Sequence, residues 1–317
     1  KKKIEIEYNK KIKLLKKYNK FYYDLNKPKV SDKEYDELKK EIFDFEIKYN
    51  FLQSNFSPSK TVGYKPSKNF KKELHRAPML SLANAFSEED LVNFEKKLLN
   101  FLSKENNFKL EYSAEPKIDG ISASLTYKNG RFEKGLSRGD GKEGEDITLN
   151  LSTINDIPKK IISKDFPEEI DIRGEVFIKN SNFENLKDKF ANPRNAASGS
   201  LRQKNPEDTK KIPLNFIAYT YGFEKGLNIK SQSDFLKKLN EWGFKTNSLN
   251  KLISGVKNLI LNYNEIEKQR ANLDFDIDGI VYKINDFDLQ KRLGNIANAP
   301  RWAIAHKFSS SKGISEI

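Results

Sequence analysis

Cysteine is absent from the 317 residues, and there are only two histidines. The chain can therefore form no disulfide, no thiol nucleophile and no thiolate zinc site, and it has too few histidines for a histidine-rich metal site. Long apolar runs are also missing, since none approaches the ~18 residues that a membrane helix needs. Any chemistry must depend on lysine, arginine, carboxylate or hydroxyl side chains.

The length predicts about two domains. The balance of 37% hydrophobic and 32% charged residues is typical of a soluble, globular protein. No segment that resembles a signal peptide precedes the first periodic stretch, so we expect a cytoplasmic protein without membrane association. The net charge of +13 is compatible with a polyanionic partner. However, residues 1–20 alone carry +7 of it, so charge by itself does not identify that partner as nucleic acid.

Two amphipathic helices are expected near the N-terminus. Apolar residues recur every three or four positions over residues 4–22 and again over residues 35–49. Residues 53–70 are rich in Ser, Pro, Asn and Lys and resemble a linker. We therefore predict a helical hairpin domain over residues 1–68 and a larger domain over residues 69–317.

The larger domain mixes strands and helices. Residues 108–116 and 121–127 are expected to be strands, Asn129-Gly130 is a strong hairpin signal, and Ser87 is expected to cap a helix. Further strands are predicted at residues 170–178, 214–221, 276–284 and 302–308, and further helices at residues 181–190, 231–241 and 255–270. Hairpins followed by interspersed helices argue for an α+β fold and against a regular βαβ repeat.

One predicted strand gathers three ionisable side chains. Because side chains alternate between the two faces of a strand, Glu115, Lys117 and Asp119 point the same way. They form a small acid-base constellation around one lysine. The alternative interpretation is a solvated strand face with two weak ion pairs.

A neutral lysine amine is a good nucleophile, but at a reference pKa of ~10.4 only about one lysine in two or three thousand is neutral at pH 7. Burial or nearby cations lower that pKa. Arg138, Lys283 and Lys307 are candidate cations, each in a strand-like or glycine-rich setting. Lys307 shares a strand face with Ala303 and Ala305, which leaves room for a ligand against the sheet.

Two further patterns suit a ligand site. The loop that begins at Arg138 has three glycines within six residues, which would let backbone approach a phosphate closely. A mobile, charged hairpin loop is the alternative interpretation. Asp171, Arg173 and Glu175 share one face of the strand predicted at residues 170–178.

In the strand predicted at residues 276–284, two candidate site residues are an odd number of positions apart. On a regular strand Asp278 and Lys283 would face opposite ways, so either a bulge at Gly279 reconciles them or only one of them faces the site. His306 falls with apolar neighbours and is predicted to be a core residue, and His75 is predicted to be structural.

Together these motifs resemble the covalent nucleotidyltransferases, which include polynucleotide ligases and messenger-RNA capping enzymes. Lys117-Ile118-Asp119-Gly120 matches their K-x-D-G pattern, which is weak on its own. Its place in an ordered series makes the match specific. The other members of the series are residues 138–141, 173–177, 278–283 and 302–308.

Within that group the chain resembles the bacterial NAD-dependent DNA ligases. Tyr22-Tyr23 followed by residues 30–36 resembles the small helical domain that holds the nicotinamide mononucleotide half of NAD. Residues 78–86 and 190–202 resemble further stretches of the same enzymes. The resemblance implies a helical domain followed by an ATP-grasp-like nucleotidyltransferase domain with a mixed, mainly antiparallel sheet.

The resemblance also implies that Lys117 attacks the adenylyl phosphorus of NAD, releases nicotinamide mononucleotide and becomes lysyl-AMP, the first step of nick sealing in DNA replication and repair. The implied cofactor-binding residues are Tyr22, Asp32, Tyr35 and Asp36 for the mononucleotide, Ser81 and Leu82 for the adenosine pocket, Glu115 for the adenine edge, Glu175 for the ribose or a metal-bound water, and Arg138, Lys283 and Lys307 for the phosphates.

Magnesium, or manganese in its place, is the implied metal, with Asp119, Glu175 and Asp278 as outer-shell partners and Asp119 also as a catalytic residue.

The family continues past the segment that ends near Phe308 into an oligonucleotide-binding barrel, a four-cysteine zinc module and further domains. Zinc is expected only in that part. The implied partner of the full-length enzyme is nicked double-stranded DNA, and we expect a monomer.

Two other classes stay open at this point. An ATP- or GTP-using covalent nucleotidyltransferase shares the K-x-D-G pattern, but cleaving ATP requires no nicotinamide-binding hairpin. A basic, non-catalytic nucleic-acid-binding module would account for the charge but not for the ordered motifs.

Overall fold

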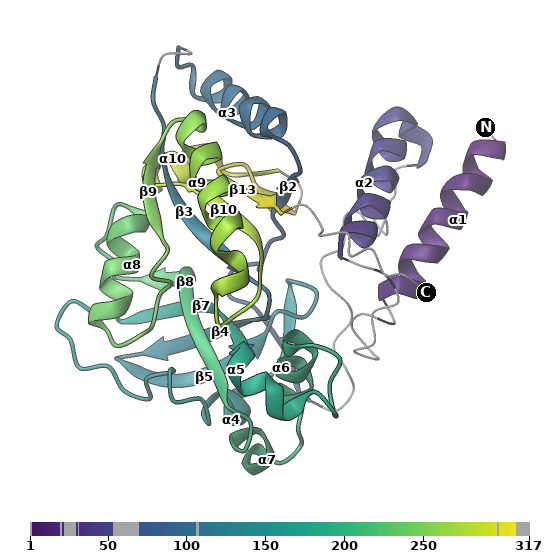
Figure 1. The fold of residues 1–317 in the computed structure, drawn as a ribbon. Coiled ribbons are helices and arrows are strands. Elements are labelled where there is room, and N and C mark those ends of the chain that lie inside the picture. The colour runs from purple at the N-terminus through teal and green to yellow at the C-terminus, as the bar shows by residue number, and fades with distance from the viewer. Residues whose placement is uncertain are drawn as a thin grey trace.

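The computed structural model describes residues 2–19, 21, 30, 32–52, 70–105, 108–296 and 298–308. Its first part is a pair of helices, α1 (Lys2–Asn19) and α2 (Asp32–Lys48), followed by the short 3-10 helix η2 (Asn50–Leu52) (Figure 1). Their apolar stripes pack together around Leu15 and Ile42, which are fully buried. The predicted amphipathic helices are therefore confirmed over the described residues.

A five-stranded sheet runs through the next part of the chain. Its strand order is β2 (Ala83–Ala85), β13 (Ala303–Lys307), β10 (Ile277–Ile284), β3 (Glu111–Ile118) and β9 (Lys251–Ser254). Only the pairing of β13 with β2 is parallel within this sheet. Leucines and isoleucines pack onto the sheet from α3 (Glu88–Leu102), α9 (Val256–Gln269) and α10 (Phe287–Leu293).

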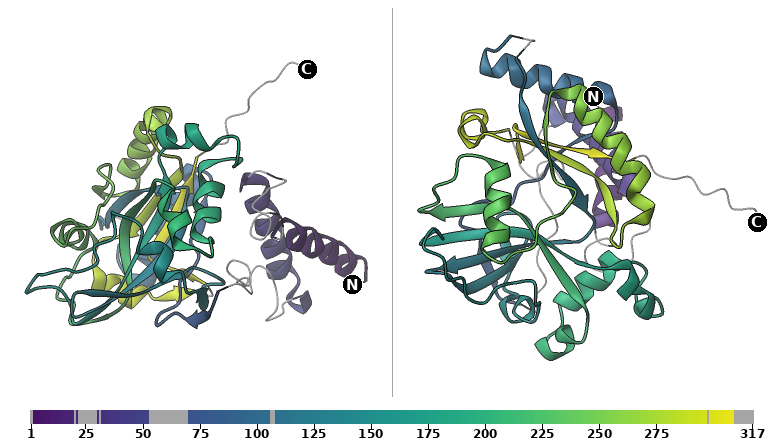
Figure 2. Two further views of the ribbon diagram at one scale, coloured as in Figure 1. Left: turned by 90° about the horizontal axis from the view of Figure 1, so that it is seen from below. Right: turned by 60° about the vertical axis from the view of Figure 1, so that its left-hand side comes forward.

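A four-stranded antiparallel sheet follows the order β5 (Arg131–Ser137), β4 (Ile121–Lys128), β7 (Glu169–Ile178) and β8 (Leu214–Lys225). Figure 2 shows the two sheets from two further directions. The core of the second sheet includes side chains from α4 (Thr148–Leu151), α5 (Asn180–Phe183), η3 (Glu184–Leu186), α6 (Pro193–Leu201) and α8 (Gln232–Glu241). Each sheet therefore has one apolar face that helices cover.

The remaining elements are short. Two pairs of strands form separate two-stranded sheets, β1 (Lys72–Leu74) with β6 (Glu143–Glu145) and β11 (Asn295–Ile296) with β12 (Ala299–Pro300). The short helices α7 (Pro206–Lys210) and η4 (Arg270–Asn272) lie in connections.

Local signals in the sequence account for several boundaries. Asn129 and Gly130 both have positive φ angles, 48° and 73°, as a two-residue turn between antiparallel strands requires. Ser87 accepts a hydrogen bond from the Asp90 amide while the Asp90 side chain accepts from the Ser87 amide, so the expected cap of α3 is a complete capping box.

The helix predicted at residues 181–190 is wrong as a single element. The structure has α5, then η3, then a turn. Both the amide and the hydroxyl of Ser181 donate to the Asp274 carboxylate, and such local polar bonds compete with a continuous helix. The helix α6 was not predicted, although Asn192 as the cap and Pro193 in the first turn are typical of a helix start.

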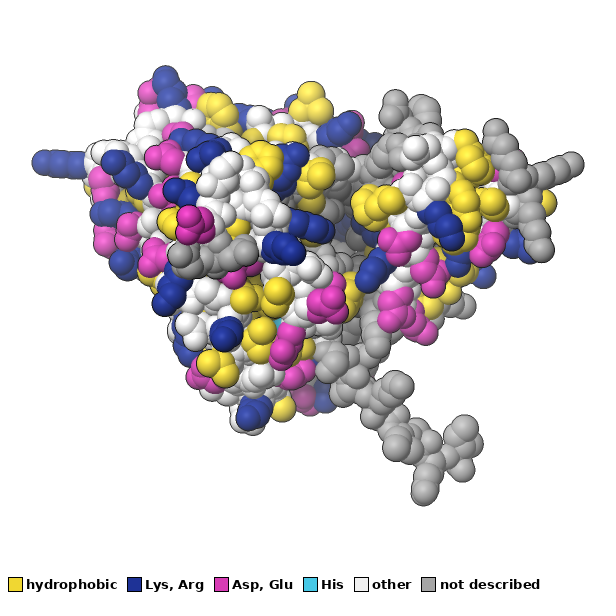
Figure 3. Space-filling model, turned by 90° about the horizontal axis from the view of Figure 1, so that it is seen from above, with side chains coloured by type: hydrophobic (Ala, Val, Ile, Leu, Met, Phe, Trp, Pro, Cys, Tyr) yellow, Lys and Arg dark blue, Asp and Glu magenta, His cyan; other side chains and the backbone are white. Residues whose placement is uncertain are grey.

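The predicted α+β class with mainly antiparallel sheets is confirmed. Among the described residues, no helix combines the length and the apolar character needed to cross a bilayer. Figure 3 shows basic and acidic side chains interspersed over one face of the molecule, so the excess of lysine does not gather into a single patch on that face.

Candidate functional site

The candidate site lies where the polar faces of the two sheets meet. On β3, Ala114 and Ile118 point into the apolar core, so Glu115 and Lys117 occupy the opposite face. On β7, isoleucines fill the second core while Asp171, Arg173 and Glu175 share the other face. The shared faces are confirmed for Glu115 with Lys117 and for Asp171, Arg173 and Glu175. Asp119, which was predicted to share the face of Glu115 and Lys117, lies just past the end of β3, where the alternation of a strand no longer applies.

Lys117 and Lys307 share one carboxylate, that of Asp278. The distances from Asp278 Oδ2 are 2.9 Å to Lys117 Nζ and 2.7 Å to Lys307 Nζ. Burial alone would raise the pKa of Asp278, but the two ammonium groups hold it well below the usual range of an aspartic acid. Asp278 is therefore ionised at neutral pH and holds both lysines in place.

A β-bulge brings Asp278 to this position. The register between β10 and β3 shifts between Ile277 and Gly279, so Asp278 is the extra residue opposite the end of β3. Gly279 is required there because a Cβ atom would lie 2.3 Å from the carbonyl oxygen of His306. The bulge that the sequence suggested at Gly279 is confirmed, and it resolves the parity of this strand.

Glu115 lies deeper in the same sheet face and is fully engaged. One carboxylate oxygen accepts hydrogen bonds from Ser113 Oγ and Gln232 Nε2, both at 2.9 Å. The other accepts from Lys283 Nζ at 2.7 Å. Lys283 also donates to the carbonyl oxygen of Tyr219 on β8 at 3.0 Å, which joins the two sheets.

Glu175 faces this group from β7. Burial raises its pKa to about 7, against the opposing effect of Arg194, of a hydrogen bond from Ser122 and of Lys117. Arg194 from α6 lies 2.5 Å from the Asp119 carboxylate. The end of the K-x-D-G segment is therefore held by an arginine from another part of the chain.

Ser81 and Arg138 meet at the edge of the site. The Arg138 guanidinium donates to Ser81 Oγ at 3.0 Å, and the Ser81 amide donates to the carbonyl oxygen of Asn298 at 2.8 Å. Leu82 is half-buried beside it. The geometry brings two of the residues expected at the adenosine and the phosphates into direct contact.

Of the four residues expected to hold the mononucleotide, the structure describes the side chain of one, Tyr35. Tyr22 and the side chains of Asp32 and Asp36 lie outside the described residues. Tyr35 lies on α2, where its hydroxyl donates to Asn19 Oδ1 at 2.6 Å. Their contact with a mononucleotide stays a prediction.

The sequence led us to expect three cations around Lys117, and one of them, Lys307, lies beside it on the Asp278 carboxylate. The hydrogen-bond partners of the other two lie elsewhere. Lys283 is engaged by Glu115, and Arg138 by Ser81. Contacts between segments far apart in the chain decide these partners, and parity along a single strand does not reveal them.

His306 is a core residue, as predicted, and the structural role of His75 stays a prediction. His306 is buried and stacks on Tyr263 with ring centroids 3.9 Å apart. Burial lowers the pKa of His306 to about 4, so the ring is neutral at physiological pH. His75 lies 3.1 Å from the carbonyl oxygen of Arg138.

Sequence reasoning gave no role to Arg194 or Gln232, which contact Asp119 and Glu115 directly. Arg194 was visible only as part of the family-like stretch 190–202. Gln232 begins a predicted helix, and nothing in its local sequence indicates a distant partner.

The carboxylates suit a hydrated metal better than a directly bound one. Over the described ranges, no group of three or more His, Cys, Asp or Glu side chains could hold a metal ion. Asp119 is paired with Arg194, and Asp278 uses one oxygen for two lysines. Asp278 Oδ1, however, is buried without a hydrogen-bond partner, which leaves one acceptor for a metal-bound water.

Two family models match successive parts of the chain. Residues 67–311 match the model of the NAD-dependent DNA ligase adenylation domain, and residues 1–63 match the DNA ligase-like, N-terminal NAD+-binding domain. The chain belongs to the NAD-dependent DNA ligase adenylation domain family. The predicted family, with NAD as its substrate or cofactor, is thus confirmed.

Relatives of this ligase domain are proteins named DNA ligase. The one from Pelagibacter ubique is 68% identical over 99% of this chain and 46% of its own length, and the one from Bradyrhizobium sp. is 44% identical over 96% and 43%. The chain therefore spans about half the length of these relatives. An ATP-dependent DNA ligase from bacteriophage T7 aligns over 71% of this chain and 67% of its own, at 17% identity and a TM-score of 0.36, which is too low to carry an argument.

Proposed function

We propose that this chain performs the adenylation step of DNA ligation, in which Lys117 is the nucleophile and NAD is the adenylate donor. The observation that carries the proposal is the placement of Lys117. It lies at the end of β3, fixed by Asp278, with Lys307 on the same carboxylate. This arrangement presents one lysine beside a second cation at a site where a phosphate could enter.

In the proposed reaction the Lys117 ammonium first loses a proton to solvent water. A bond then forms between Lys117 Nζ and the adenylyl phosphorus, and the bond from that phosphorus to the bridging oxygen breaks. Nicotinamide mononucleotide leaves with that oxygen, and the enzyme keeps AMP as a phosphoramidate. Because the pKa of Asp278 is held low, Asp278 orients Lys117 and is a poor permanent acceptor for the proton.

Other residues would bind the nucleotide. Glu115 would meet the adenine edge, Ser81 and Leu82 would line the adenosine pocket, and Glu175 would hold the ribose or a metal-bound water. Arg138, Lys283 and Lys307 would stabilise the negative charge of the phosphates. Tyr22, Asp32, Tyr35 and Asp36 would grip the mononucleotide.

Asp119, Glu175 and Asp278 would hold the water shell of magnesium, or of manganese in its place. The metal would supply charge neutralisation at the phosphates when bound. The unpartnered Asp278 Oδ1 supports this role. Asp119 would act through its contact with Arg194, which keeps the loop after Lys117 in place.

The relatives named DNA ligase support a wider proposal for the full-length protein. It would act as a monomer in the cytoplasm on nicked double-stranded DNA, using further domains beyond those described. A zinc module is expected only in such a further part.

We also propose that residues 1–68 and 69–317 are separate domains with separate tasks. The cluster around Leu15 and Ile42 is distinct from the two sheet cores. Deletion of residues 1–68 should cripple adenylation by NAD, because the mononucleotide would lose its grip, while a protein adenylated beforehand should still carry out the steps that need no mononucleotide. Undiminished adenylation of the deleted protein by NAD would refute this role for the helical hairpin.

The direct test of the proposed function is intact mass after incubation with NAD and magnesium, with a parallel sample given ATP and a third given neither. We expect a gain of one AMP from NAD alone. A gain from ATP alone would move the chain to the ATP-using class. No gain from either, once prior adenylation is excluded by the third sample, would overturn the proposal.

A further inference from the structure

The segment that carries Ser81 and Leu82 lies in neither a helix nor a strand. Three backbone hydrogen bonds attach it to neighbouring loops. The amides of His75, Met79 and Ser81 donate to the carbonyl oxygens of Lys142, Gly141 and Asn298, each at 2.8 Å. The segment continues directly into β2, which attaches its end to the five-stranded sheet. The three acceptors lie in turns, so these bonds alone would not fix the segment against the four-stranded sheet.

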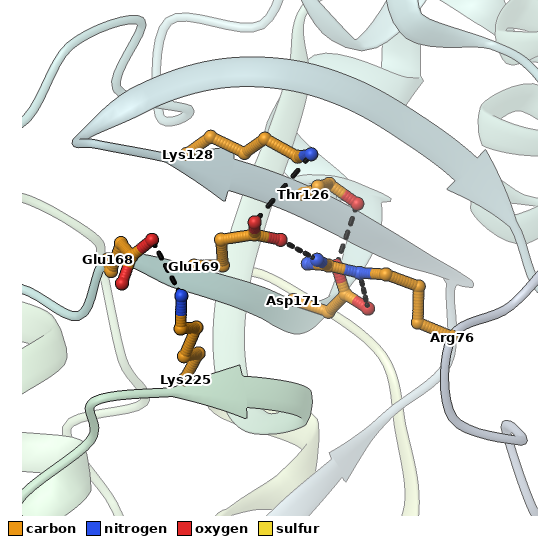
Figure 4. A network of polar contacts seen from close by, with 7 residues as sticks. All are labelled: Arg76, Thr126, Lys128, Glu168, Glu169, Asp171 and Lys225. Atoms are coloured by element: carbon orange, nitrogen blue, oxygen red, sulfur yellow. Dashed lines mark hydrogen bonds and ion pairs between the residues drawn. The ribbon is translucent and has the colours of Figure 1, made fainter.

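Arg76 supplies the missing link to the four-stranded sheet (Figure 4). Its Nε lies 3.1 Å from Asp171 Oδ2, and its other donor to that carboxylate lies 2.6 Å from Oδ1. The remaining terminal nitrogen donates to Glu169, and the guanidinium lies 4.2 Å from the centre of the Phe223 ring. A two-pronged arginine–carboxylate pair has a defined geometry that a single ion pair lacks.

A second arginine makes the reciprocal contact. Arg173 on β7 donates to the carbonyl oxygens of Ala77 at 2.5 Å and Pro78 at 3.1 Å. One arginine therefore reaches from the segment to β7, and the other reaches from β7 to the segment.

The strand face that receives these contacts also carries Glu175. Asp171, Arg173 and Glu175 alternate along β7, and a strand interior is a rigid spacer. The Asp171 side chain is only 5% exposed, and Thr126 Oγ1 holds it from β4 at 2.7 Å. The position of Ser81 relative to Glu175 is thus set through a short path that runs from the partly exposed Arg76 to the buried Asp171.

We propose that Arg76 is a positioning residue for nucleotide binding: its forked ion pair with Asp171 fixes residues 77–82 at the distance from β7 that the adenosine of NAD requires. This inference rests on the proposed function. It predicts that loss of the fork weakens NAD binding while the chemistry at Lys117, on the other sheet, continues in those molecules that bind.

The test compares Arg76→Ala with the wild type in single-turnover adenylation at a series of NAD concentrations. Because each molecule reacts once, KM here is the NAD concentration that gives half of the maximal rate, and kcat is the maximal rate constant. We expect KM to rise on the order of 10-fold to 100-fold, since misplacing a binding group by about 1 Å has effects of this size, and kcat to change less than about 3-fold. Arg76→Lys, which keeps the charge but loses the fork, should fall between the two. In a Lys117→Ala background, calorimetry should show the same rise in the dissociation constant for NAD.

Lys128→Ala is the matched control. Lys128 pairs with the same Glu169 at 3.7 Å but does not reach the segment, so KM should stay at the wild-type value. An unchanged KM in Arg76→Ala would overturn the inference. A fall in kcat and melting temperature with KM unchanged would do so too, because it would indicate a structural role. If the wild type takes up no AMP from NAD, the proposed function fails instead, and the two failures are distinguishable.

Discussion

Glu115 and Asp278 lie on the same face of one sheet and each pairs with lysine, yet they differ in how completely their oxygens are used. Glu115 has both oxygens engaged by three donors, and its side chain is 5% exposed. Asp278 binds two lysines through one oxygen, its other oxygen is unpartnered, and its side chain is 16% exposed.

This difference indicates that Glu115 mainly stabilises the fold, whereas Asp278 can exchange its lysine partners during the reaction. A saturated, buried ion pair rearranges only when an incoming group replaces one of its partners, because breaking it leaves an uncompensated charge. The adenine and phosphate contacts proposed for Glu115 and Lys283 would therefore have to replace existing hydrogen bonds. Two cations on one carboxylate oxygen are a different case, since either lysine could take a phosphate oxygen as a new partner. We therefore expect substitutions at Glu115 to affect stability first and substitutions around Asp278 to affect reaction first.

The largest expected effect is at the exchange site. Lys117→Ala should abolish the gain of AMP from NAD, because the nucleophile is gone, and Lys117→Arg should do the same, since a guanidinium remains protonated. Intact mass measures the first result and thermal unfolding checks that the fold persists. Normal labelling of the alanine variant would remove Lys117 from the mechanism.

Next comes a direct comparison of the two carboxylates. Glu115→Gln should lower the free energy of unfolding by about 3 kcal/mol, as loss of one partner of a buried pair does, whereas Asp278→Asn should lower it less and slow adenylation more. Denaturant unfolding and single-turnover labelling measure the two quantities. Equal losses of stability in the two variants would contradict the expectation that Glu115 contributes more to stability than Asp278 does.

A third carboxylate, Glu175, should make stability depend on pH. Burial raises its pKa to about 7, so the protonated form is favoured in the folded state. Its contribution is complete below the unfolded pKa and is lost as pH rises through the folded value, by up to about 3 kcal/mol. Unfolding free energies from about pH 5 to pH 8 should decline less in Glu175→Gln than in the wild type. Parallel curves would contradict the assignment.

The smallest effect should come from removing one hydrogen bond to the carboxylate of the Glu115–Lys283 pair. Ser113→Ala removes one of the three donors to Glu115 and should cost about 1 kcal/mol, with adenylation by NAD retained. The matched substitution Ser122→Ala removes the hydrogen bond to Glu175 and should instead shift the pH dependence of stability. A change in labelling rate for Ser113→Ala larger than about 10-fold would place Glu115 among the exchanging groups.

Much of this site follows from local sequence. Strand alternation placed Glu115 with Lys117, and Asp171 with Glu175, because the period of a strand is a local property. On a regular strand Asp278 and Lys283 would face opposite ways, and the glycine that follows Asp278 indicated that a bulge could bring them to the same face. These are the features that one segment determines by itself.

What sequence did not reveal depends on segments far apart in the chain. The contact of Arg194 with Asp119 and that of Gln232 with Glu115 require the packing of helices onto sheets, which no local pattern specifies. The broken helix at residues 181–190 has the same origin, because the carboxylate that competes for its first turn, Asp274, comes from a loop nearly a hundred residues later.

The parallel pairing of β2 with β13 has a consequence for synthesis. Ala83–Ala85 finds its partner only in Ala303–Lys307, roughly 220 residues later, so at about 5–20 residues per second the nascent segment waits some 10–45 s on the ribosome. Near the end of that interval, once Ile277–Ile284 has been made, the β10 edge that β13 will cover is also unprotected until β13 follows. Within the described residues, β13 is the last strand of the five-stranded sheet to be synthesised, and it carries Lys307, so completion of this sheet and completion of the lysine pair around Asp278 are one event.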